Sequence, residues 1–422
     1  MVRYMYFLIA IFILVTLSPL ATVFGKEKLP NTIIQDPSVL AKLKDLVNKK
    51  NDPNVQNFLE NLISQSNVIL TKKVTSVMDK HELPPSGDKH DFYSLAAYEW
   101  PNPNTTSGLP YVSRDGKINP EIYTIPDKVN LEKLVERVNI LAVANYLTQN
   151  TTYSLKAQEL LRVWFLDKDT LMNPNLNYAE IEKGKGRLNP SGIMEGVYLP
   201  GLVDAIALLK QSPDWSKEIE DGMQVWFSNY LNWLINSTSG KTEGKRMNNH
   251  GTYYNMQVAS IALYLNRSDF TKELLQSMTQ DVSSAPLDEV SKLIAVRINP
   301  DGSQPFEAVR TTSLHYHMYN LLGLFHLASI GERVGIDLWN YKVHGVGLRK
   351  ALDFMMPYAL NQAQWPFQQI GPIYKDELAQ LSCEAILHYG NNPSYIAAYK
   401  SINSETLRIN PNYPLCNSIV YR

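Results

Sequence analysis

The sequence has few cysteines, no excess of either charge and no cysteine–histidine pattern typical of a metal site. Its 422 residues include only two cysteines, Cys383 and Cys416, which an oxidising compartment would allow to form one disulfide bond. Lysine and arginine number 40 and aspartate and glutamate 41, so the formal net charge is −1. A chain without a basic excess is not expected to bind nucleic acid.

The sequence also lacks the alternating pattern of β-strands, apart from short possible strand pieces near 294–298. Apolar residues instead recur with the spacing of amphipathic helices. Such stripes cover 131–142, 157–165, 197–209, 223–235, 253–265, 314–330, 348–360 and 377–389. Loops rich in glycine, proline, asparagine and aspartate separate them. We therefore predict an all-α chain of helical hairpins packed in a ring, with an open bundle as the alternative.

The N-terminus resembles a secretory signal peptide. Arg3 precedes an apolar stretch over 5–20, and Gly25 offers a cleavage site. A membrane anchor of marginal length is the alternative, but no stop-transfer segment follows. Glycosylation sequons begin at Asn104, Asn150, Asn236 and Asn266. We expect a signal peptide over 1–25, one domain over 26–422, a secreted or periplasm-like location, and no stable membrane insertion after cleavage. The oligomeric state stays open.

Two motifs carry groups that suit one reaction. The first contains Asn249-His250, and the second contains Arg310 followed by Tyr316. An amide, an imidazole, a guanidinium and a phenol are the groups needed to break a uronic-acid polymer by β-elimination. Arg310 can neutralise the uronate carboxylate, with help from Asn249 and His250. Tyr316 can then remove the proton that the neutralised carboxylate acidifies.

Each motif also has a plainer explanation. Asn249-His250 can be a polar loop before a helix that begins near Tyr253, with Gly251 or Thr252 as its cap. Arg310 can form a structural ion pair with Glu307, and Tyr316 can be a core residue. The two motifs together favour the catalytic interpretation.

Other titratable residues give weaker signals. Glu195 and Glu307 could form the carboxylate pair of a glycoside hydrolase, but their spacing does not favour this over ordinary ion pairing. His315 and His317 flank Tyr316 without a third residue at metal-ligand spacing. We expect His317 to be structural and His315 to face the cleft.

Several segments resemble, in order, the alginate lyase superfamily. They are Ser94–Pro103, Gly108–Gly116, Trp164–Leu166, Met172–Asn175, Gly186-Arg187, Asn248–Thr252 and Pro300–Pro305. The Arg310-to-Tyr316 spacing is closest to polysaccharide lyase family thirty-eight, whose members cut mannuronan or glucuronan. The resemblance implies an (α/α) toroid, an incomplete barrel of six or seven helical hairpins, with Asn249, His250, Arg310 and Tyr316 in the active site. Glu99 and Leu314 depart from the family pattern, which frequently has an aromatic residue there.

The expected activity is therefore that of a polysaccharide lyase on (1→4)-linked polyuronates, with an anionic polysaccharide as the partner. Tyr316 acts as base and then as acid, and no metal or organic cofactor is required. The residues expected to contact the sugar are Trp100, Arg187, Gln304, His315 and Trp365. A glycoside hydrolase on a similar toroid and a catalytically inactive carbohydrate-binding protein are the alternatives.

Overall fold

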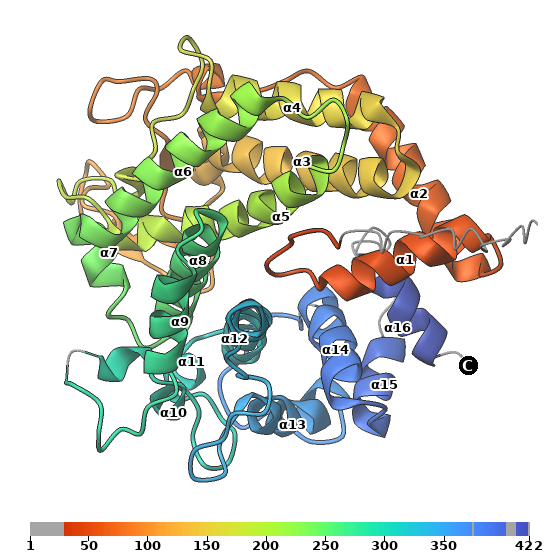
Figure 1. Cartoon of the computed structure of the whole chain (residues 1–422). Coiled ribbons are helices and arrows are strands. Elements are labelled where there is room, and N and C mark those ends of the chain that lie inside the picture. Colours follow the sequence, from red (N-terminus) through yellow and green to blue (C-terminus); the bar gives the residue numbers. More distant parts are fainter. Residues whose placement is uncertain (1–28, 288, 374, 402–410, 421–422) are drawn as a thin grey trace, which may run out of the picture.

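Helices arranged in an incomplete ring make up most of the molecule, as Figure 1 shows. The computed structural model describes residues 29–287, 289–373, 375–401 and 411–420. The signal peptide expected over 1–25 lies outside this part. The longer helices are α1 (Pro37–Lys49), α2 (Pro53–Leu70), α3 (Asp127–Thr148), α4 (Thr151–Phe165), α5 (Leu199–Leu209), α6 (Lys217–Asn236), α8 (Asn249–Tyr264), α9 (Ser268–Ser277), α12 (Ser313–Val334), α13 (Leu348–Ala359) and α14 (Lys375–Tyr389).

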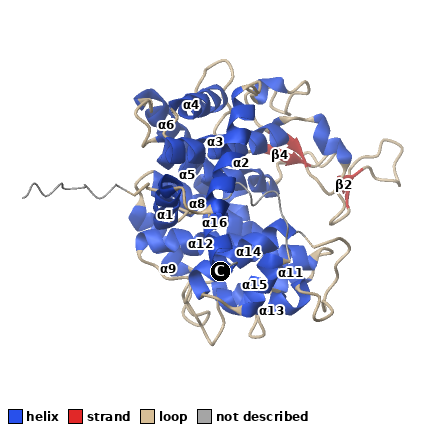
Figure 2. Ribbon diagram, turned by 90° about the vertical axis from the view of Figure 1, so that its right-hand side faces the viewer, coloured by secondary structure: helices blue, strands red, loops and turns tan. Residues whose placement is uncertain are grey.

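Shorter elements connect these helices. They are α7 (Thr238–Glu243), α10 (Ile294–Arg297), α11 (Pro305–Ala308), α15 (Pro393–Lys400), α16 (Tyr413–Val420) and the 3-10 turns η1 (Val77–Asp79), η2 (Pro120–Thr124), η3 (Pro190–Tyr198) and η4 (Val290–Lys292). Two small sheets lie at one side of the ring, where Figure 2 shows them in red. In one, β1 (Tyr93–Leu95) pairs in parallel with β4 (Tyr178–Ile181), and in the other β2 (Glu99–Trp100) pairs antiparallel with β3 (Val112–Ser113).

Local sequence explains where the helices begin and end. Asp52 caps α2, because its carboxylate accepts hydrogen bonds from the N–H groups of Asn54 and Val55. Helix α12 ends at Val334, and the φ of 75° at the next residue, Gly335, lets its N–H bond to the carbonyl of Gly331.

Helices that pack side by side form the ring, and some of these pairs are consecutive in the chain. The close pairs are α3 with α4 and α5, α8 with α9 and α12, and α12 with α14. Helices α8 and α12 are buried on almost every face, as expected for helices inside such a ring. The structure therefore confirms the predicted ring of helical hairpins, the (α/α) toroid. The stretch Pro190–Leu209 is apolar and long enough to span a membrane, but it is mostly buried inside the ring.

A disulfide bond joins Cys383 of α14 to Cys416 of α16. Helix α16 also contacts α1 and α2, at the other end of the chain. The bond therefore fixes the C-terminal helix where it bridges the last and the first hairpins.

The structure corrects two local expectations. The strand pieces expected near 294–298 are wrong, because Ile294–Arg297 forms the short helix α10. Helix α8 begins at Asn249 rather than near Tyr253. The first motif therefore lies in the first turn of a helix and not in the loop before it.

Candidate active site

The first turn of α8 carries Asn249 and is capped by a glutamate from another element. Glu307, in α11, accepts hydrogen bonds from the backbone N–H of Asn249 at 2.6 Å and from its side-chain amide at 2.8 Å. Both residues are almost completely buried. Burial raises the pKa of Glu307, and the bonds from Asn249 oppose this rise. Glu307 thus fixes both the helix start and the amide of Asn249.

His250 is oriented by a second buried carboxylate. Its Nδ1 is hydrogen-bonded to Glu243, which is completely buried at the end of α7. Glu243 also accepts a hydrogen bond from Nε of Arg246 at 2.9 Å. In the neutral imidazole this arrangement places the proton on Nδ1 and leaves the lone pair on Nε2.

A buried arginine holds the loop before α8. The guanidinium of Arg297 donates to the carbonyls of Arg246, Met247 and Asn248 and to the hydroxyl of Thr252, at 2.8 to 3.2 Å. Burial lowers the pKa of Arg297 to about 10, so the side chain remains charged at neutral pH. One side chain therefore holds the backbone before Asn249 and the side chain of Thr252 after His250.

The second motif forms a stacked pair. Arg310 lies just before α12, and its guanidinium is 3.6 Å from the ring centroid of Tyr316, in the first turn. The ion pair considered between Arg310 and Glu307 is wrong: Nη2 of Arg310 lies 2.5 Å from Asp115 instead. Tyr316 is 7% exposed, and its hydroxyl is 3.0 Å from the hydroxyl of Tyr98. Burial raises the pKa of Tyr316, and the charge of Arg310 opposes this rise.

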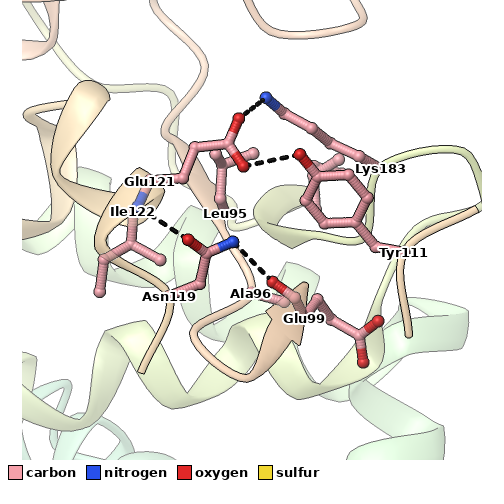
Figure 3. Close-up of a pocket in the computed structure, with 9 residues that line it drawn as sticks. Leu95, Ala96, Glu99, Tyr111, Asn119, Glu121, Ile122 and Lys183 are labelled. Atoms are coloured by element: carbon pink, nitrogen blue, oxygen red, sulfur yellow. Dashed lines mark hydrogen bonds and ion pairs between the residues drawn. The ribbon is translucent and has the colours of Figure 1, made fainter. Parts of the chain in front are cut away.

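One loop supplies both partners of this pair. Tyr98 and Asp115 lie between β1 and η2, and Figure 3 shows how the base of their loop is fixed. Asn119 donates to the carbonyl of Glu99 at 2.9 Å. Glu121 binds the hydroxyl of Tyr111 at 2.7 Å and, on its other oxygen, the ammonium of Lys183 at 2.5 Å (Figure 3).

Glu307 lies between the two motifs. It binds Asn249 directly, and the charges of Arg310 and His250 both lower its pKa against the effect of burial. Helices α8 and α12, which begin at the two motifs, pack together. The structure thus brings the four expected catalytic residues into one region.

Four of the five expected sugar contacts are at least partly accessible. Trp100 and Trp365 are half-buried, with indole N–H groups that donate to the carbonyl of Lys117 and to the hydroxyl of Ser313. His315 is half-buried and bonds to Glu377 at 2.9 Å, with its ring centroid 4.9 Å from that of Tyr316. The side chain of Arg187 is 73% exposed.

Gln304 was expected to contact the sugar, and this expectation is wrong. Its side chain is completely buried, donates to the carbonyl of His317 at 2.8 Å and accepts from Asn320 at 2.6 Å. His317 is also completely buried, as expected of a structural residue. The residues missed from the sequence are Tyr98, Asp115, Glu243 and Arg297. The pairing of each with a motif is visible only in three dimensions, although Tyr98 and Asp115 lie in segments that resemble the superfamily.

The glutamates considered as a hydrolase pair serve separate partners. Glu195 is 3.0 Å from the ammonium of Lys128, whereas Glu307 binds Asn249. Within the described ranges, no group of three or more histidine, cysteine, aspartate or glutamate side chains is placed to hold a metal ion.

Comparisons with known proteins point to one family. The alginate lyase family profile matches residues 76–365. An alginate lyase from Bacteroides ovatus has a TM-score of 0.82 and 29% sequence identity, over 93% of this chain and 99% of that chain. Alginate lyase A1-III from Sphingomonas species A1 has a TM-score of 0.47 and 15% identity, over 79% of this chain and 88% of that chain. No curated protein sequence matched.

Proposed function

The chain belongs to the alginate lyase family of polysaccharide lyases, and from this premise we propose that it cleaves (1→4)-linked polyuronates by β-elimination, with Tyr316 as the catalytic base and acid. The substrate class is mannuronan, alginate or glucuronan. The observation that carries the proposal is the guanidinium of Arg310 stacked 3.6 Å from the ring centroid of Tyr316. A buried phenol needs a cation of this kind to work as a base.

The environment of Tyr316 suits a group that both takes and returns a proton. An ordinary tyrosine has a pKa of about 10. Burial raises the pKa of Tyr316 further, so its phenolate is a strong base once formed. Arg310 stabilises that phenolate, and Tyr98 can donate a hydrogen bond to it. The protonated phenol then returns the proton to the leaving oxygen.

The stereochemistry of the substrate allows one residue to do both steps. In β-D-mannuronate and β-D-glucuronate, the C5 hydrogen and the C4 oxygen lie on the same face of the ring. Tyr316 removes the C5 proton, the C4–O bond breaks, and a double bond forms between C4 and C5. The proton taken from C5 passes to the oxygen released from C4, so no water or cofactor is consumed.

The carboxylate of the substrate is bound, in this proposal, by Arg310, Asn249 and His250. Nη1 of Arg310 makes no hydrogen bond to any described residue, so it remains available to a carboxylate. The first turn of α8 adds the positive end of its helix dipole. Neutralising the carboxylate acidifies the C5 hydrogen and stabilises the enolate-like intermediate.

We also propose that the protein is secreted. The N-terminal sequence predicts a signal peptide, and the structure contains a disulfide bond between Cys383 and Cys416. Disulfide bonds form and persist mainly in oxidising compartments. The four sequon asparagines, Asn104, Asn150, Asn236 and Asn266, are all exposed. Mass spectrometry of the secreted protein, expressed with its own N-terminus, tests both the cleavage site and the glycosylation.

One assay tests the activity against its alternatives. The protein is incubated with polymannuronate, polyguluronate and glucuronan, and ultraviolet absorbance and reducing ends are followed together. A lyase raises both signals, because its product contains a conjugated double bond. A hydrolase raises only the reducing ends, and a binding protein raises neither.

The same assay tests the role of Tyr316. L-guluronate is the C5 epimer of D-mannuronate, so its C5 hydrogen lies on the face opposite the C4 oxygen. We expect faster initial rates on polymannuronate or glucuronan at equal uronate concentration. Faster cleavage of polyguluronate would instead assign the base to a second residue, with His250 the first to test.

A further inference from the structure

The carboxylate of Asp115 binds one edge of the Arg310 guanidinium. Nη2 of Arg310 is 2.5 Å from Oδ1 of Asp115, and Nε is 3.2 Å from both carboxylate oxygens. This two-point contact fixes the plane of the guanidinium as well as its position. With that edge held, the carbon of the guanidinium lies 3.6 Å from the ring centroid of Tyr316, and Nη1 makes no hydrogen bond to a described residue.

Asp115 is itself fixed by the residue after Arg310. The backbone N–H of Thr311 donates to Oδ2 of Asp115 at 3.0 Å, and the Thr311 hydroxyl lies 3.0 Å from the same oxygen. Gly116, the residue after Asp115, has a φ of +73°. A Cβ atom at this position would lie 2.6 Å from the Thr311 hydroxyl. Only glycine allows this close approach without strain. The loop is therefore shaped to hold Asp115 against Arg310 and Thr311.

The contact is ionic and only partly shielded from water. The side chains of Arg310 and Asp115 are 18% and 31% exposed. Burial by itself would raise the pKa of Asp115, but hydrogen bonds from Arg310 and Thr311 hold this pKa below its usual range. Asp115 is thus ionised wherever Tyr316 can act as a base.

We propose that Asp115 is a positioning residue, which holds Arg310 flat against Tyr316 and balances its charge. The proposal rests on the proposed role of Tyr316 and extends it. Arg310 then has three separate contacts: its edge binds Asp115, its face stabilises the Tyr316 phenolate, and Nη1 is left for the substrate. Without Asp115, Arg310 is free to rotate away from the ring.

Charged and titratable groups face Tyr316 from several elements. Arg310 covers the ring, and Asp115 and Tyr98 approach from the loop. His315, on the same helix, has its ring centroid 4.9 Å from that of Tyr316. Among these, only Asp115 is a fixed negative charge, and it opposes Arg310. Removing that charge while keeping the contact lowers the pKa of Tyr316, so the acid limb of the kcat profile moves to lower pH.

Two substitutions separate position from charge. Asp115→Asn keeps an oxygen that accepts a bond from Arg310 but loses the charge, so its acid limb shifts to lower pH with most of kcat retained. Asp115→Ala loses the contact, and kcat on polymannuronate falls by roughly 10-fold to 100-fold with little change in KM. Glu289→Gln is the matched control, because the Lys292–Glu289 ion pair has similar exposure, 26% and 29%, and lies outside the site.

The results that contradict the proposal are distinct. If both Asp115 variants lower only the melting temperature, as Glu289→Gln does, Asp115 has a purely structural role. If Asp115→Ala lowers kcat further in an Arg310→Ala background, Asp115 does not act through Arg310.

A measurement without turnover separates this inference from the proposed function. The crystal structure of Asp115→Ala shows where the guanidinium of Arg310 lies once Asp115 no longer holds its edge. We expect it to move off the ring of Tyr316, even if the wild type cleaves none of the three polymers. A guanidinium still 3.6 Å from the ring centroid of Tyr316 overturns the inference whatever the substrate is.

Discussion

The two halves of the active site are held in different ways. Asn249 and His250 are fixed by Glu307, Glu243 and Arg297, all of which are at most 1% exposed. Arg310 and Tyr316 are instead held by Asp115 and Tyr98, whose contacts cross 195 and 218 positions of the chain. The first set of contacts belongs to the buried core, and the second depends on a loop at the side of the ring.

This difference predicts how each half responds to substitution. The contacts around α8 are part of the packed core. Substitutions that break them should therefore lower the stability of the protein more than its activity. The contacts around Tyr316 need the loop to be docked, and its base is fixed by ion pairs and hydrogen bonds such as Lys183–Glu121 (Figure 3). Breaking them costs activity first, because little of the core depends on that loop.

The largest expected effect is that of Tyr316→Phe. The substitution keeps the ring under Arg310 but removes the hydroxyl that exchanges the proton. Loss of a general acid–base typically lowers the rate by about 10²–10⁴-fold, and here one group has both roles. The measurement is initial velocity on polymannuronate, with the melting temperature as a control for folding. A folded variant with near-normal turnover would refute the assignment of Tyr316.

The next effect is that of Arg310→Ala, which removes the charge beside both the phenolate and the substrate carboxylate. We expect kcat to fall by roughly 10²–10³-fold with a smaller change in KM, because the charge matters most in the transition state. Arg310→Lys should recover only part of the loss, because an ammonium lacks the planar edge that binds Asp115. Both constants come from steady-state kinetics, and a variant that loses only thermal stability contradicts the catalytic role.

The sequence predicted the helices better than their contacts. The stripes over 131–142 and 314–330 lie within α3 and α12, because buried helix faces repeat every three to four residues. Periodicity failed at 294–298, where a short apolar run fits a strand or a helix equally well. In the structure this run forms the short helix α10.

The site was predicted in part for a similar reason. The resemblance located Asn249, His250, Arg310 and Tyr316, because their motifs are contiguous in the sequence. Asp115 and Arg310 lie 195 positions apart in the sequence. Sequence patterns such as helical periodicity cannot predict a contact over this distance. Gln304 was misplaced, because a polar side chain in a motif can be buried when its hydrogen bonds are satisfied inside.

The α8 half is tested by Arg297→Met, which is close in size but cannot bond to the loop carbonyls. The hydroxyl of the completely buried Thr252 and the carbonyl of the half-buried Asn248 would lose their bonds from Arg297. An unsatisfied buried acceptor costs about 1–3 kcal/mol, so we expect the free energy of unfolding to fall by roughly 3 kcal/mol. Chemical denaturation measures this loss. Lower activity with unchanged stability would show that the α8 half does not differ from the Tyr316 half.

The effect that is smallest near neutral pH is a pH dependence of stability from His317, which lies next to Tyr316 but belongs to the buried core. Its Nδ1 donates to the carbonyl of Ser313, and its Nε2 accepts from the N–H of Gln304 at 3.0 Å. In the protonated ring, the hydrogen on Nε2 would point at the N–H of Gln304. The folded protein therefore favours the neutral form of His317. Burial lowers the pKa of His317 to about 4.

Because the folded pKa of His317 is lower than that of an unfolded histidine, about 6.5, protonation favours the unfolded chain. The contribution of neutral His317 to the free energy of unfolding is complete above pH of about 6.5. As the pH is lowered from there to the folded pKa, this contribution falls by about 1.4 kcal/mol per pH unit. Wild type should therefore lose more stability than His317→Gln when the pH is lowered across this window, as followed by denaturation at each pH. The glutamine variant does not titrate there, so it isolates the histidine from the other acid-sensitive groups. Parallel losses in both proteins would mean that His317 is not the group that responds, and that the core beneath Tyr316 tolerates acid as well as the rest of the ring.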